Sequence, residues 1–505
     1  MAMLDNVAFD NEKYISEQTS EILERVKMFN NKLYLEFGGK LLFDYHASRV
    51  LPGYDPNVKM RLLQQLKDSA DIILCIFAGD IERRKIRADF GITYDSDALK
   101  IIDDLREWGI EVTAVVITRF DNQPSAVLFK NKLERRNIKV YTHYAIKGYP
   151  ADIDIIVSKD GYGKNPYIET TKPLVVVTGP GPGSGKLSTC LSQLYHEHKQ
   201  GKNAGYAKFE TFPIWNLPLK HPVNIAYEAA TADLRDVNMI DPFHLEAYGK
   251  TTVNYNRDIE IFPVISRVLE AITESKVYRS PTDMGVNKVG FAITDDKGAC
   301  YAAKQETIRR FFRYRCEYAM GVADIETVNR AQVIMRELNI GESDRKVVEP
   351  ARKAAEERRA GKGSEGIFCG AALELKSSEI ITGKNSPQFH ASSSLVLNAI
   401  KTLAGLPDRI HLLSPQIIDS IHNLKKNILG AKNPSLDLEE TLTALCICAI
   451  TNPTAQEAME KLKELHGCEM HMTHLPATGD EGGLRRLGVN LTTDPNFASK
   501  NLFIK

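Results

Sequence analysis

The sequence predicts an α/β protein of 505 residues with two parallel-sheet units, a helical segment and a smaller mixed α/β C-terminal domain. Short apolar stretches, such as residues 72–77, do not alternate with polar residues, which is typical of strands buried on both faces of a parallel sheet. Amphipathic stretches of 10–14 residues, which predict helices, separate these strands. One strand also runs through a glycine-rich turn into a helix, an arrangement that is phosphate-binding-loop-like.

The first 165 residues supply the clearest alternation of helices and strands. A helix is predicted over residues 13–30 because Ile15, Ile22 and Val26 lie near one stripe. A strand in KLYLEF follows and ends at a Gly-Gly-Lys turn. The further elements expected are helices 59–69, 95–108 and 124–136 and strands 71–77, 112–118 and 138–141. We therefore predict an N-terminal α/β domain over residues 1–165.

Three further regions complete the predicted organisation. Residues 166–302 form an α/β unit in which strands 174–177 and 206–210 are expected to be neighbours, because consecutive strands usually are. Residues 303–366 are strongly helical and charged, and residues 367–505 are mixed. The elements expected in the last region are helices 392–404, 415–427 and 438–450 and strands 410–413 and 468–473.

Charge and composition exclude several classes of protein. Lys and Arg total 65 and Asp and Glu total 65, so the net charge is zero, whereas a nucleic-acid-binding protein normally carries a basic excess. The hydrophobic fraction of 43% and the charged fraction of 26% are ordinary globular values and argue against disorder. No apolar run reaches the roughly 18 residues that span a bilayer. We therefore expect neither a nucleic acid nor a membrane as a partner.

The compartment and the assembly state are also predicted. The segment MAMLDNVAFDNEKY lacks the pattern of a signal peptide, and the eight cysteines lie mostly in apolar stretches, as buried free thiols do. These features predict a cytoplasmic protein. Zero net charge gives little mutual repulsion, and Ile308, Phe311, Phe312 and Tyr318 would be exposed on an unpacked helix. We therefore expect a homo-oligomer.

The sharpest motif is the glycine-rich turn in LVVVTGPGPGSGKLST. Glycine takes backbone angles closed to other residues and lets a phosphate approach the main chain. Successive N–H groups at the start of the following helix would bind an anion, and the lysine would reach the terminal phosphates. The predicted cofactor-binding residues are Gly181, Gly183, Ser184, Gly185, Lys186 and Ser188.

The turn departs from the common form G-x-x-x-x-G-K followed by Ser or Thr. Pro180 takes the first glycine position, and Leu187 separates the lysine from Ser188, an order that resembles adenylate-kinase-like enzymes more than GTPases. Because each helical residue rotates by about 100°, direct Mg²⁺ ligation by Ser188 is disfavoured. A simple Gly-Pro turn with a solvent-facing lysine is one alternative. A dinucleotide turn with Glu210 at the ribose is another, although G-x-G-x-x-G fails in every register.

Residues 208–258 are rich in polar and aromatic side chains and are predicted to be largely irregular. Loops carry function disproportionately, and this one follows a strand that ends at the same edge of the sheet as the glycine-rich turn. Asp241 or His244 would serve as a general base, and Lys250 or Arg257 would stabilise developing phosphate charge. The alternative is a surface loop whose charges pair locally.

The expected cofactor is ATP or another nucleotide with Mg²⁺. A phosphotransferase needs an acid that holds this ion, and Asp295 and Asp296 after the strand-like FAIT are candidates, although DDKG equally predicts a turn.

We expect no zinc and assign no protein metal ligands. His-Glu-x-x-His is absent, and His196 and His198 are too close in sequence to share one helical face. Cys468, His471 and His474 have metal-like spacing, but on a strand His471 would point to the opposite face from the other two.

Three long strings make the chain similar to a known family. They are TGPGPGSGKLSTCLSQLYHE, AGYAKFETFPIWNLPLKHPVNIAYEAATADL and NMIDPFHLEAYGKTTVNYNRD. They resemble the bacterial uncharacterised protein family three-seventy-one, or domain of unknown function eighteen-forty-six. The resemblance extends from YLEFGGKLLFDYHASRVLPGYD near the start to ITNPTAQEAMEKL near the end. It implies no established activity.

Three functional hypotheses follow, all with a small phosphorylated ligand. The first is an NTP-dependent phosphotransferase or ligase that acts on a small metabolite. The second is an enzyme that binds a phosphorylated metabolite or a dinucleotide without using NTP. The third is a nucleotide-sensing assembly protein without turnover, which a test of ATP turnover would separate from the first.

Overall fold

The computed structural model describes residues 7–498 except 31, 88–90, 210–212, 357–362 and 364–365. The chain divides into two compact units. We call residues 6–303 the N-terminal unit and residues 304–505 the C-terminal unit. The boundary lies within one helix, α13 (Asp296–Ala319).

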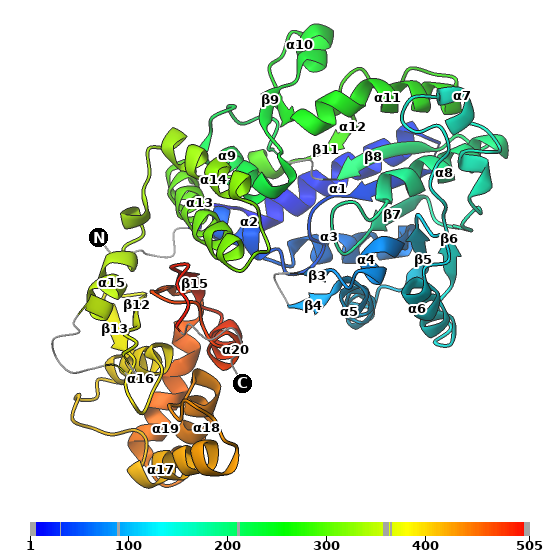
Figure 1. The fold of residues 1–505 in the computed structure, drawn as a ribbon. Helices are drawn as coiled ribbons and strands as arrows, with labels where there is room; N and C mark the ends of the chain where they lie inside the picture. Colours follow the sequence, from blue (N-terminus) through cyan, green and yellow to red (C-terminus); the bar gives the residue numbers. More distant parts are fainter. Residues whose placement is uncertain are drawn as a thin grey trace. The chain divides into compact units, whose positions relative to one another are not determined.

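A seven-stranded parallel sheet forms the centre of the N-terminal unit (Figure 1). In spatial order its strands are β11 (Gly285–Val286), β8 (Gly205–Phe209), β1 (Leu33–Phe37), β7 (Leu174–Thr178), β2 (Ala70–Phe77), β5 (Val112–Thr118) and β6 (Val140–Thr142). Every neighbouring pair is parallel. The side chains of the central strands are buried almost throughout, as the non-alternating apolar stretches predicted. The α/β class is therefore confirmed.

The prediction of two separate parallel-sheet units is wrong, because strands from residues 1–165 and 166–302 share one sheet. β1 pairs with β7 on one side and with β8 on the other, and Leu35 lies opposite both Val176 and Ala207. The predicted adjacency of β7 and β8 is wrong for the same reason. Adjacency of consecutive strands is only a tendency, and local sequence does not reveal a strand inserted from far upstream.

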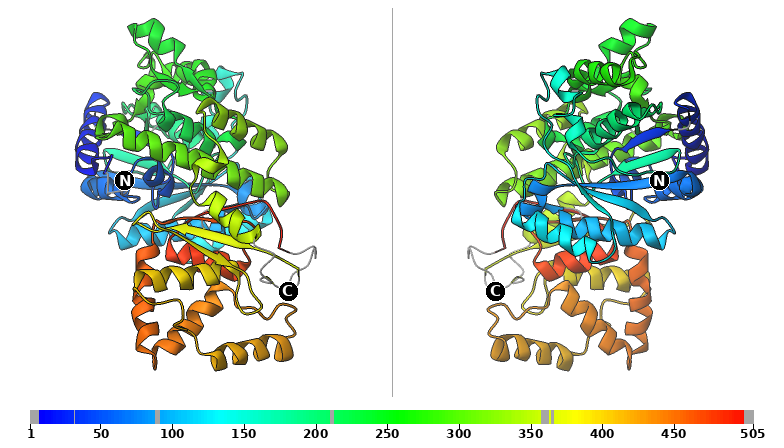
Figure 2. Two further views of the ribbon diagram at one scale, coloured as in Figure 1. Left: turned by 90° about the vertical axis from the view of Figure 1, so that its left-hand side faces the viewer. Right: turned by 90° about the vertical axis from the view of Figure 1, so that its right-hand side faces the viewer.

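Helices lie on both sides of this sheet (Figures 1 and 2). The connection from β1 to β2 and that from β7 to β8 run in opposite directions, so right-handed crossovers place their helices on opposite faces. The helices are α1 (Asn11–Met28), α2 (Tyr45–Val50), α3 (Val58–Leu66), α4 (Ala78–Glu82), α5 (Tyr94–Glu107), α6 (Pro124–Glu134), α7 (Ile153–Ile156), α8 (Lys186–Lys199), α11 (Asn256–Thr273) and α12 (Pro281–Met284). A short hairpin, β3 (Ile86–Arg87) with β4 (Ile92–Thr93), precedes α5.

Much of residues 208–258 is regular, which corrects the prediction of a largely irregular segment. It contains α9 (Pro222–Ala230), α10 (Pro242–Tyr248) and a hairpin of β9 (Asn238–Ile240) with β10 (Val253–Tyr255). Pro222 and Pro242 occupy first positions of helices, where a proline loses no hydrogen bond and its fixed φ suits the helix. These two prolines therefore mark helix starts within the segment that was predicted to be irregular.

A four-stranded mixed sheet forms the centre of the C-terminal unit, in the order β13 (Ile380–Lys384), β12 (Gly370–Glu374), β14 (Glu469–Met472) and β15 (Asn490–Thr493). β12 is antiparallel to both neighbours, whereas β14 and β15 are parallel, so the mixed character is confirmed. The helices are α14 (Ile325–Glu337), α15 (Val348–Glu356), α16 (Ala391–Leu403), α17 (Pro415–Asn423), α18 (Leu438–Ala449), α19 (Pro453–Glu460) and α20 (Thr478–Leu487). The predicted strand 410–413 is absent from this described segment. Leu412 and Leu413 are buried without strand pairing, so the apolar run reflects packing.

The residues expected to be exposed on the helix after position 303 are mostly buried. Ile308 and Phe312 are 0% exposed and Phe311 is 6% exposed, whereas Tyr318 is 48% exposed. The ring of Phe312 lies 4.9 Å from that of His471 within the C-terminal unit. The apolar premise for a homo-oligomer is therefore wrong, and oligomerisation itself stays a prediction.

The cysteines and the helices relate to the predicted compartment and to the expected absence of a membrane partner. All eight cysteines are free. Five of them are buried: Cys75, Cys190, Cys316, Cys448 and Cys468. The burial expected from an apolar stretch is confirmed for Cys75 and Cys448 but is wrong for Cys446, which is exposed. Within the part of the chain that the structure describes, no helix is both long enough and apolar enough to cross a membrane.

Leu74→Ala tests the burial of the central strands. Leu74 on β2 is 0% exposed, so its truncation should leave a cavity and lower the free energy of unfolding by about 2–5 kcal/mol. Leu128→Ala is the control, because Leu128 on α6 is 70% exposed and its loss should cost less than about 0.5 kcal/mol. Urea denaturation followed by circular dichroism measures both, and equal losses would contradict the assigned burial.

A buried carboxylate, Asp480, links two helices of the C-terminal unit to His390. Asp480 is 2% exposed and accepts hydrogen bonds from Ser392 Oγ at 2.6 Å and from the N–H of Leu438 at 3.0 Å. His390 Nδ1 lies 2.7 Å from the same carboxylate. Burial by itself lowers the pKa of His390, but the hydrogen bond and the charge of Asp480 outweigh it and raise this pKa above its ordinary value of 6.5.

His390→Gln should remove a contribution to stability that depends on pH. Because the pKa is raised on folding, the contribution is fully present below the unfolded value of about 6.5 and is lost as the pH rises through the folded pKa. The difference in unfolding free energy between the natural chain and H390Q should therefore be larger at about pH 5.5 than at about pH 8.5. His411→Gln, at an exposed position, is the control. A difference that is constant with pH would contradict the pairing.

Candidate functional site

The carboxyl edge of the seven-stranded sheet contains a point where the chain connections diverge. From β2 the chain continues to β5 on one side, whereas from β7 it continues to β8 on the other. β2 and β7 are neighbours, and open α/β sheets bind ligands in the crevice at such a point. The glycine-rich turn, residues 179–185, follows β7 directly and therefore lies where a ligand is expected.

The backbone of the turn uses conformations that favour glycine. Gly183 and Gly185 have φ values of 73° and 92°, and α8 begins immediately afterwards at Lys186. The first N–H groups of α8 have no partner within the helix and carry the positive end of its dipole. The predicted strand, turn and helix are thus present in order, and phosphate binding by the turn stays a prediction.

Lys186 folds back over the turn. Its Nζ donates to the carbonyl oxygen of Gly181 at 3.3 Å and lies 3.4 Å from Ser184 Oγ. Ser184 is buried, and Ser188 is half-buried on the first turn of α8. Among the residues that the structure describes, Lys186 has no carboxylate partner, so its charge is available to an anion.

Thr118 and Arg119, at the end of β5, also hold the turn, and sequence reasoning missed both. Thr118 Oγ1 donates to the carbonyl oxygen of Ser184 at 2.7 Å, and the Arg119 guanidinium donates to that of Gly183 at 2.7 Å. The guanidinium also stacks 3.5 Å from the ring centroid of Phe77. Partial burial lowers the pKa of Arg119, but arginine remains protonated in proteins. The signal that could have identified Thr118 and Arg119 is that parallel strands β5 and β7 end at the same edge of the sheet.

The turn is packed so closely that most of its glycines accept no side chain. A Cβ at Gly179 would lie 2.4 Å from the carbonyl oxygen of Cys75, and one at Gly181 would lie 2.6 Å from the ring of Tyr94. At Gly183, by contrast, no atom lies within 4 Å of the added carbon. The glycines therefore serve close packing as well as backbone conformation.

Asp241, one of the predicted catalytic residues, caps a helix. Its side chain is buried, and Oδ1 accepts hydrogen bonds from the N–H groups of Phe243 at 3.0 Å and His244 at 3.1 Å, as the N-cap of α10. Oδ2 accepts from Thr282 Oγ1 at 2.7 Å and from Asn254 Nδ2 at 3.3 Å. The carboxylate thus ties α10 to α12, and a general base would have to give up these bonds.

The other three predicted catalytic residues lie in the same segment. His244 Nδ1 is 2.9 Å from Ser280 Oγ, Arg257 pairs with the buried Asp236 at 3.2 Å, and Lys250 is exposed. Figures 1 and 2 show α10 at an outer end of the N-terminal unit, away from the sheet. Joint action of these residues with the glycine-rich turn therefore stays a prediction that the described contacts do not support.

The strand predicted before Asp295 and Asp296 is wrong. Residues 289–292 form a 3₁₀ turn, and α13 begins at Asp296, so no strand end presents an acid there. The apolar FAI run packs as a turn: Ala292 is 1% exposed and Ile293 is half-buried. Glu210, the candidate ribose ligand, lies outside the described residues.

The histidines weighed as metal ligands bond to neighbouring polar groups. His471 is buried on β14, and its Nδ1 lies 2.9 Å from Thr492 Oγ1. Burial lowers the pKa of His471, and this effect outweighs the carboxylate of Asp494, which raises it. On α8, His196 Nε2 lies 2.7 Å from the carbonyl oxygen of Asn165. These rings satisfy neighbouring polar groups.

A cavity of about 790 Å³ lies at the opposite, amino edge of the sheet. Lys32 and Lys172 line it together with the fully buried Glu197, which accepts hydrogen bonds from the hydroxyls of Tyr34 at 2.7 Å and Tyr167 at 2.9 Å. Because open α/β sheets bind ligands at the carboxyl edge, the glycine-rich turn is the better candidate site.

Comparison with known sequences extends over both units. The family described as "Domain of unknown function DUF1846, N-terminal" matches residues 7–339, and "Domain of unknown function DUF1846, C-terminal" matches residues 343–503. The chain belongs to the DUF1846 family. The resemblance seen in the long sequence strings is therefore confirmed.

Relatives of this DUF1846 chain are similar along nearly their whole length. A UPF0371 protein of Clostridium tetani (strain Massachusetts / E88) is 58% identical over 498 residues, which cover 98% of this chain and 99% of the relative. A UPF0371 protein of Clostridium botulinum (strain ATCC 19397 / Type A) is 59% identical with the same coverage. One from Clostridium botulinum (strain Eklund 17B / Type B) is 57% identical, again over 98% of this chain and 99% of the relative. These names state a family and no activity.

Gly185→Ala should destabilise this DUF1846 protein more than Gly183→Ala. Both positions have positive φ, which costs an alanine about 1–2 kcal/mol. A Cβ at Gly185 would additionally lie 2.7 Å from the side chain of Thr118, whereas Gly183 has open space. Chemical denaturation measures both variants. Equal losses would show that Thr118 does not pack against the turn.

Proposed function

We propose that the N-terminal unit of this DUF1846 protein binds a small phosphorylated ligand at the glycine-rich turn. The observation that carries the proposal is that two cations, Lys186 and Arg119, converge on the carbonyl groups of one turn at the start of a 14-residue helix. The helix N-terminus offers N–H donors and a partial positive charge, and the side chains add two formal charges. A phosphate supplies the matching negative charge and acceptor oxygens.

We further propose that the ligand is a nucleotide, ATP or another NTP with Mg²⁺, used by a phosphotransferase or ligase. Lys186 would contact the terminal phosphates, and Arg119 would stabilise the charge that develops during transfer. Both side chains act through position and charge. His244, Lys250 and Arg257 remain proposed for acid–base and charge-stabilising roles toward the second substrate.

A cytoplasmic location belongs to the same proposal. ATP and small phosphorylated metabolites are intracellular ligands, and eight cysteines that form no disulfide bond suit a reducing compartment. Fractionation of the producing bacterium tests this directly.

Calorimetric titration with ATP, ADP and inorganic phosphate tests the site. Lys186→Ala and Arg119→Ala should each weaken binding by about 10- to 100-fold, because a hydrogen bond to a charged group contributes about 1.5–3 kcal/mol. Lys199→Ala is the matched control, since Lys199 is exposed at the far end of the same helix. Equal affinity in all three variants would reject the glycine-rich turn as the binding site.

The binding titration together with an assay of ATP turnover separates the functional hypotheses. Binding of ATP with release of ADP in the presence of a metabolite mixture supports the NTP-dependent enzyme. Binding of ATP without turnover supports the sensing protein, and binding of phosphate without nucleotide preference supports a phosphorylated metabolite. Failure of all three ligands to bind would contradict the proposal.

A further inference from the structure

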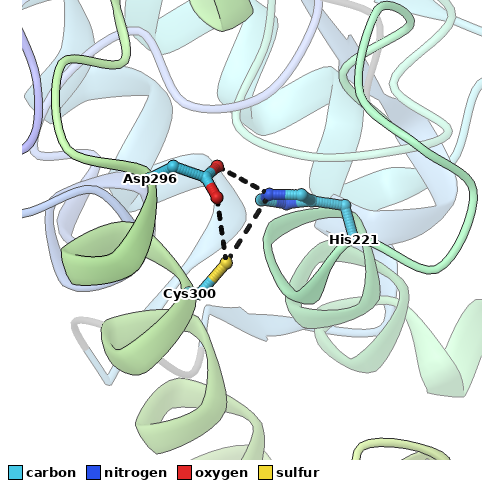
Figure 3. Close-up of side chains that lie close together, drawn as sticks. All are labelled: His221, Asp296 and Cys300. Atoms are coloured by element: carbon cyan, nitrogen blue, oxygen red, sulfur yellow. Dashed lines mark hydrogen bonds and ion pairs between the residues drawn. The ribbon is translucent and has the colours of Figure 1, made fainter.

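Three side chains that bind metals in proteins converge at the starts of two helices (Figure 3). His221 is the N-cap residue of α9, and Asp296 and Cys300 lie on the first two turns of α13. Their i, i+4 spacing places Asp296 and Cys300 on one face of the helix. The fold thus joins two segments 75 residues apart in the sequence, which follow the carboxyl ends of β8 and β11.

The separations of the three donor atoms suit one small cation. His221 Nε2 lies 2.9 Å from Asp296 Oδ1 and 3.6 Å from Cys300 Sγ, and Sγ lies 3.8 Å from Asp296 Oδ2. Tetrahedral zinc bonds of about 2.0–2.3 Å separate neighbouring donor atoms by roughly 3.3–3.7 Å. The His221–Cys300 separation is in this range, and one donor atom from each residue lies within 4.8 Å of the other two, so small side-chain rotations would let them share an ion.

Against the expectation from the sequence that the chain binds no zinc, we infer that His221, Asp296 and Cys300 form a Zn²⁺ site. Imidazole, carboxylate and thiolate are the ligand types that zinc takes in proteins, whereas Mg²⁺ and Ca²⁺ prefer oxygen ligands alone. Three protein ligands leave a fourth position for water or a substrate, as in catalytic rather than structural zinc sites. The Asp296 side chain is 67% exposed, so solvent reaches the site.

The hydrogen bonding of the His221 ring sets a condition on metal binding. Nδ1 accepts a hydrogen bond from the N–H of Val223 at 3.2 Å, which leaves the ring proton on Nε2, directed at Asp296. Zinc at Nε2 requires the tautomer with the proton on Nδ1, so this capping bond is lost on binding. Loss of an N-cap bond changes an equilibrium about five- to tenfold, which is small beside the affinity of protein zinc sites.

The same hydrogen bond argues against a nucleophilic role for Cys300. A base that activates a thiol must face the sulfur with an unprotonated nitrogen, whereas His221 Nε2 carries its proton. Asp296 also lies on the sulfur side of the ring, where it would repel a thiolate. A zinc ion accounts for all three groups together, because it binds the thiolate and neutralises the carboxylate.

Zinc titration of the full-length protein tests this site. The chain is stripped with a chelator and then titrated with Zn²⁺ in competition with a chromophoric chelator, and we expect one tight site per chain. Cys300→Ser and His221→Gln should each weaken zinc binding at least about 100-fold. Cys446→Ser, which removes an exposed cysteine of the C-terminal unit, is the matched control and should bind zinc normally.

Cobalt substitution adds a readout of the ligand type. The Co²⁺-loaded natural chain should show a thiolate-to-cobalt charge-transfer band, which C300S should lack and C446S should keep. Circular dichroism shows that each variant is folded, and Asp296→Asn replaces H221Q if the latter is not. Tight zinc binding retained in C300S, or absent from the natural chain, would overturn the inference. Lys186→Ala should leave zinc binding unchanged. The proposal of a zinc site and the proposal of a phosphate site are therefore tested independently.

Discussion

The pairing of β1 with β7 on one side and β8 on the other is the constraint on which the N-terminal unit depends. β1 lies between β7 and β8, which are consecutive strands in the sequence, so the crossover from β7 to β8 must pass over β1. β7 is thereby held between β1 and β2, at the point where connections leave in opposite directions. The glycine-rich turn owes its position at the carboxyl edge of the sheet, where the connections diverge, to this long-range pairing as much as to its own residues.

The elements of the fold were predictable where a local pattern determines them. The run Val175–Val177 and the stretch 72–77 form buried strands, because side chains that are apolar on both faces of a strand require burial on both faces of the sheet. Leu412 and Leu413 show the limit of this reasoning, since an apolar run reports burial and not the pairing of its backbone. The order of the strands was not predictable, because a strand inserted from far upstream leaves no local trace.

The residues of the candidate site likewise divide into those that the sequence could predict and those that it could not. Gly183 and Gly185 were predictable, because a turn that presents its backbone to an anion needs positive φ. Arg119 and Thr118 were not, because only the order of β7, β2 and β5 brings them to the turn. His221 and Cys300 lie 79 residues apart and belong to no spacing motif, so only the fold brings them within reach of one another.

The two cations of the turn are already held by the carbonyl groups of Gly181 and Gly183. Long side chains normally lose rotamer freedom when a ligand orders them, at a cost of about 0.5–1.5 kcal/mol each. Here that entropy is lost when the chain folds, and an arriving anion exchanges one set of acceptors for another. The turn is therefore pre-organised, and the affinity of the proposed phosphate site would depend on how well the anion's oxygens replace the carbonyl oxygens that Lys186 and Arg119 leave.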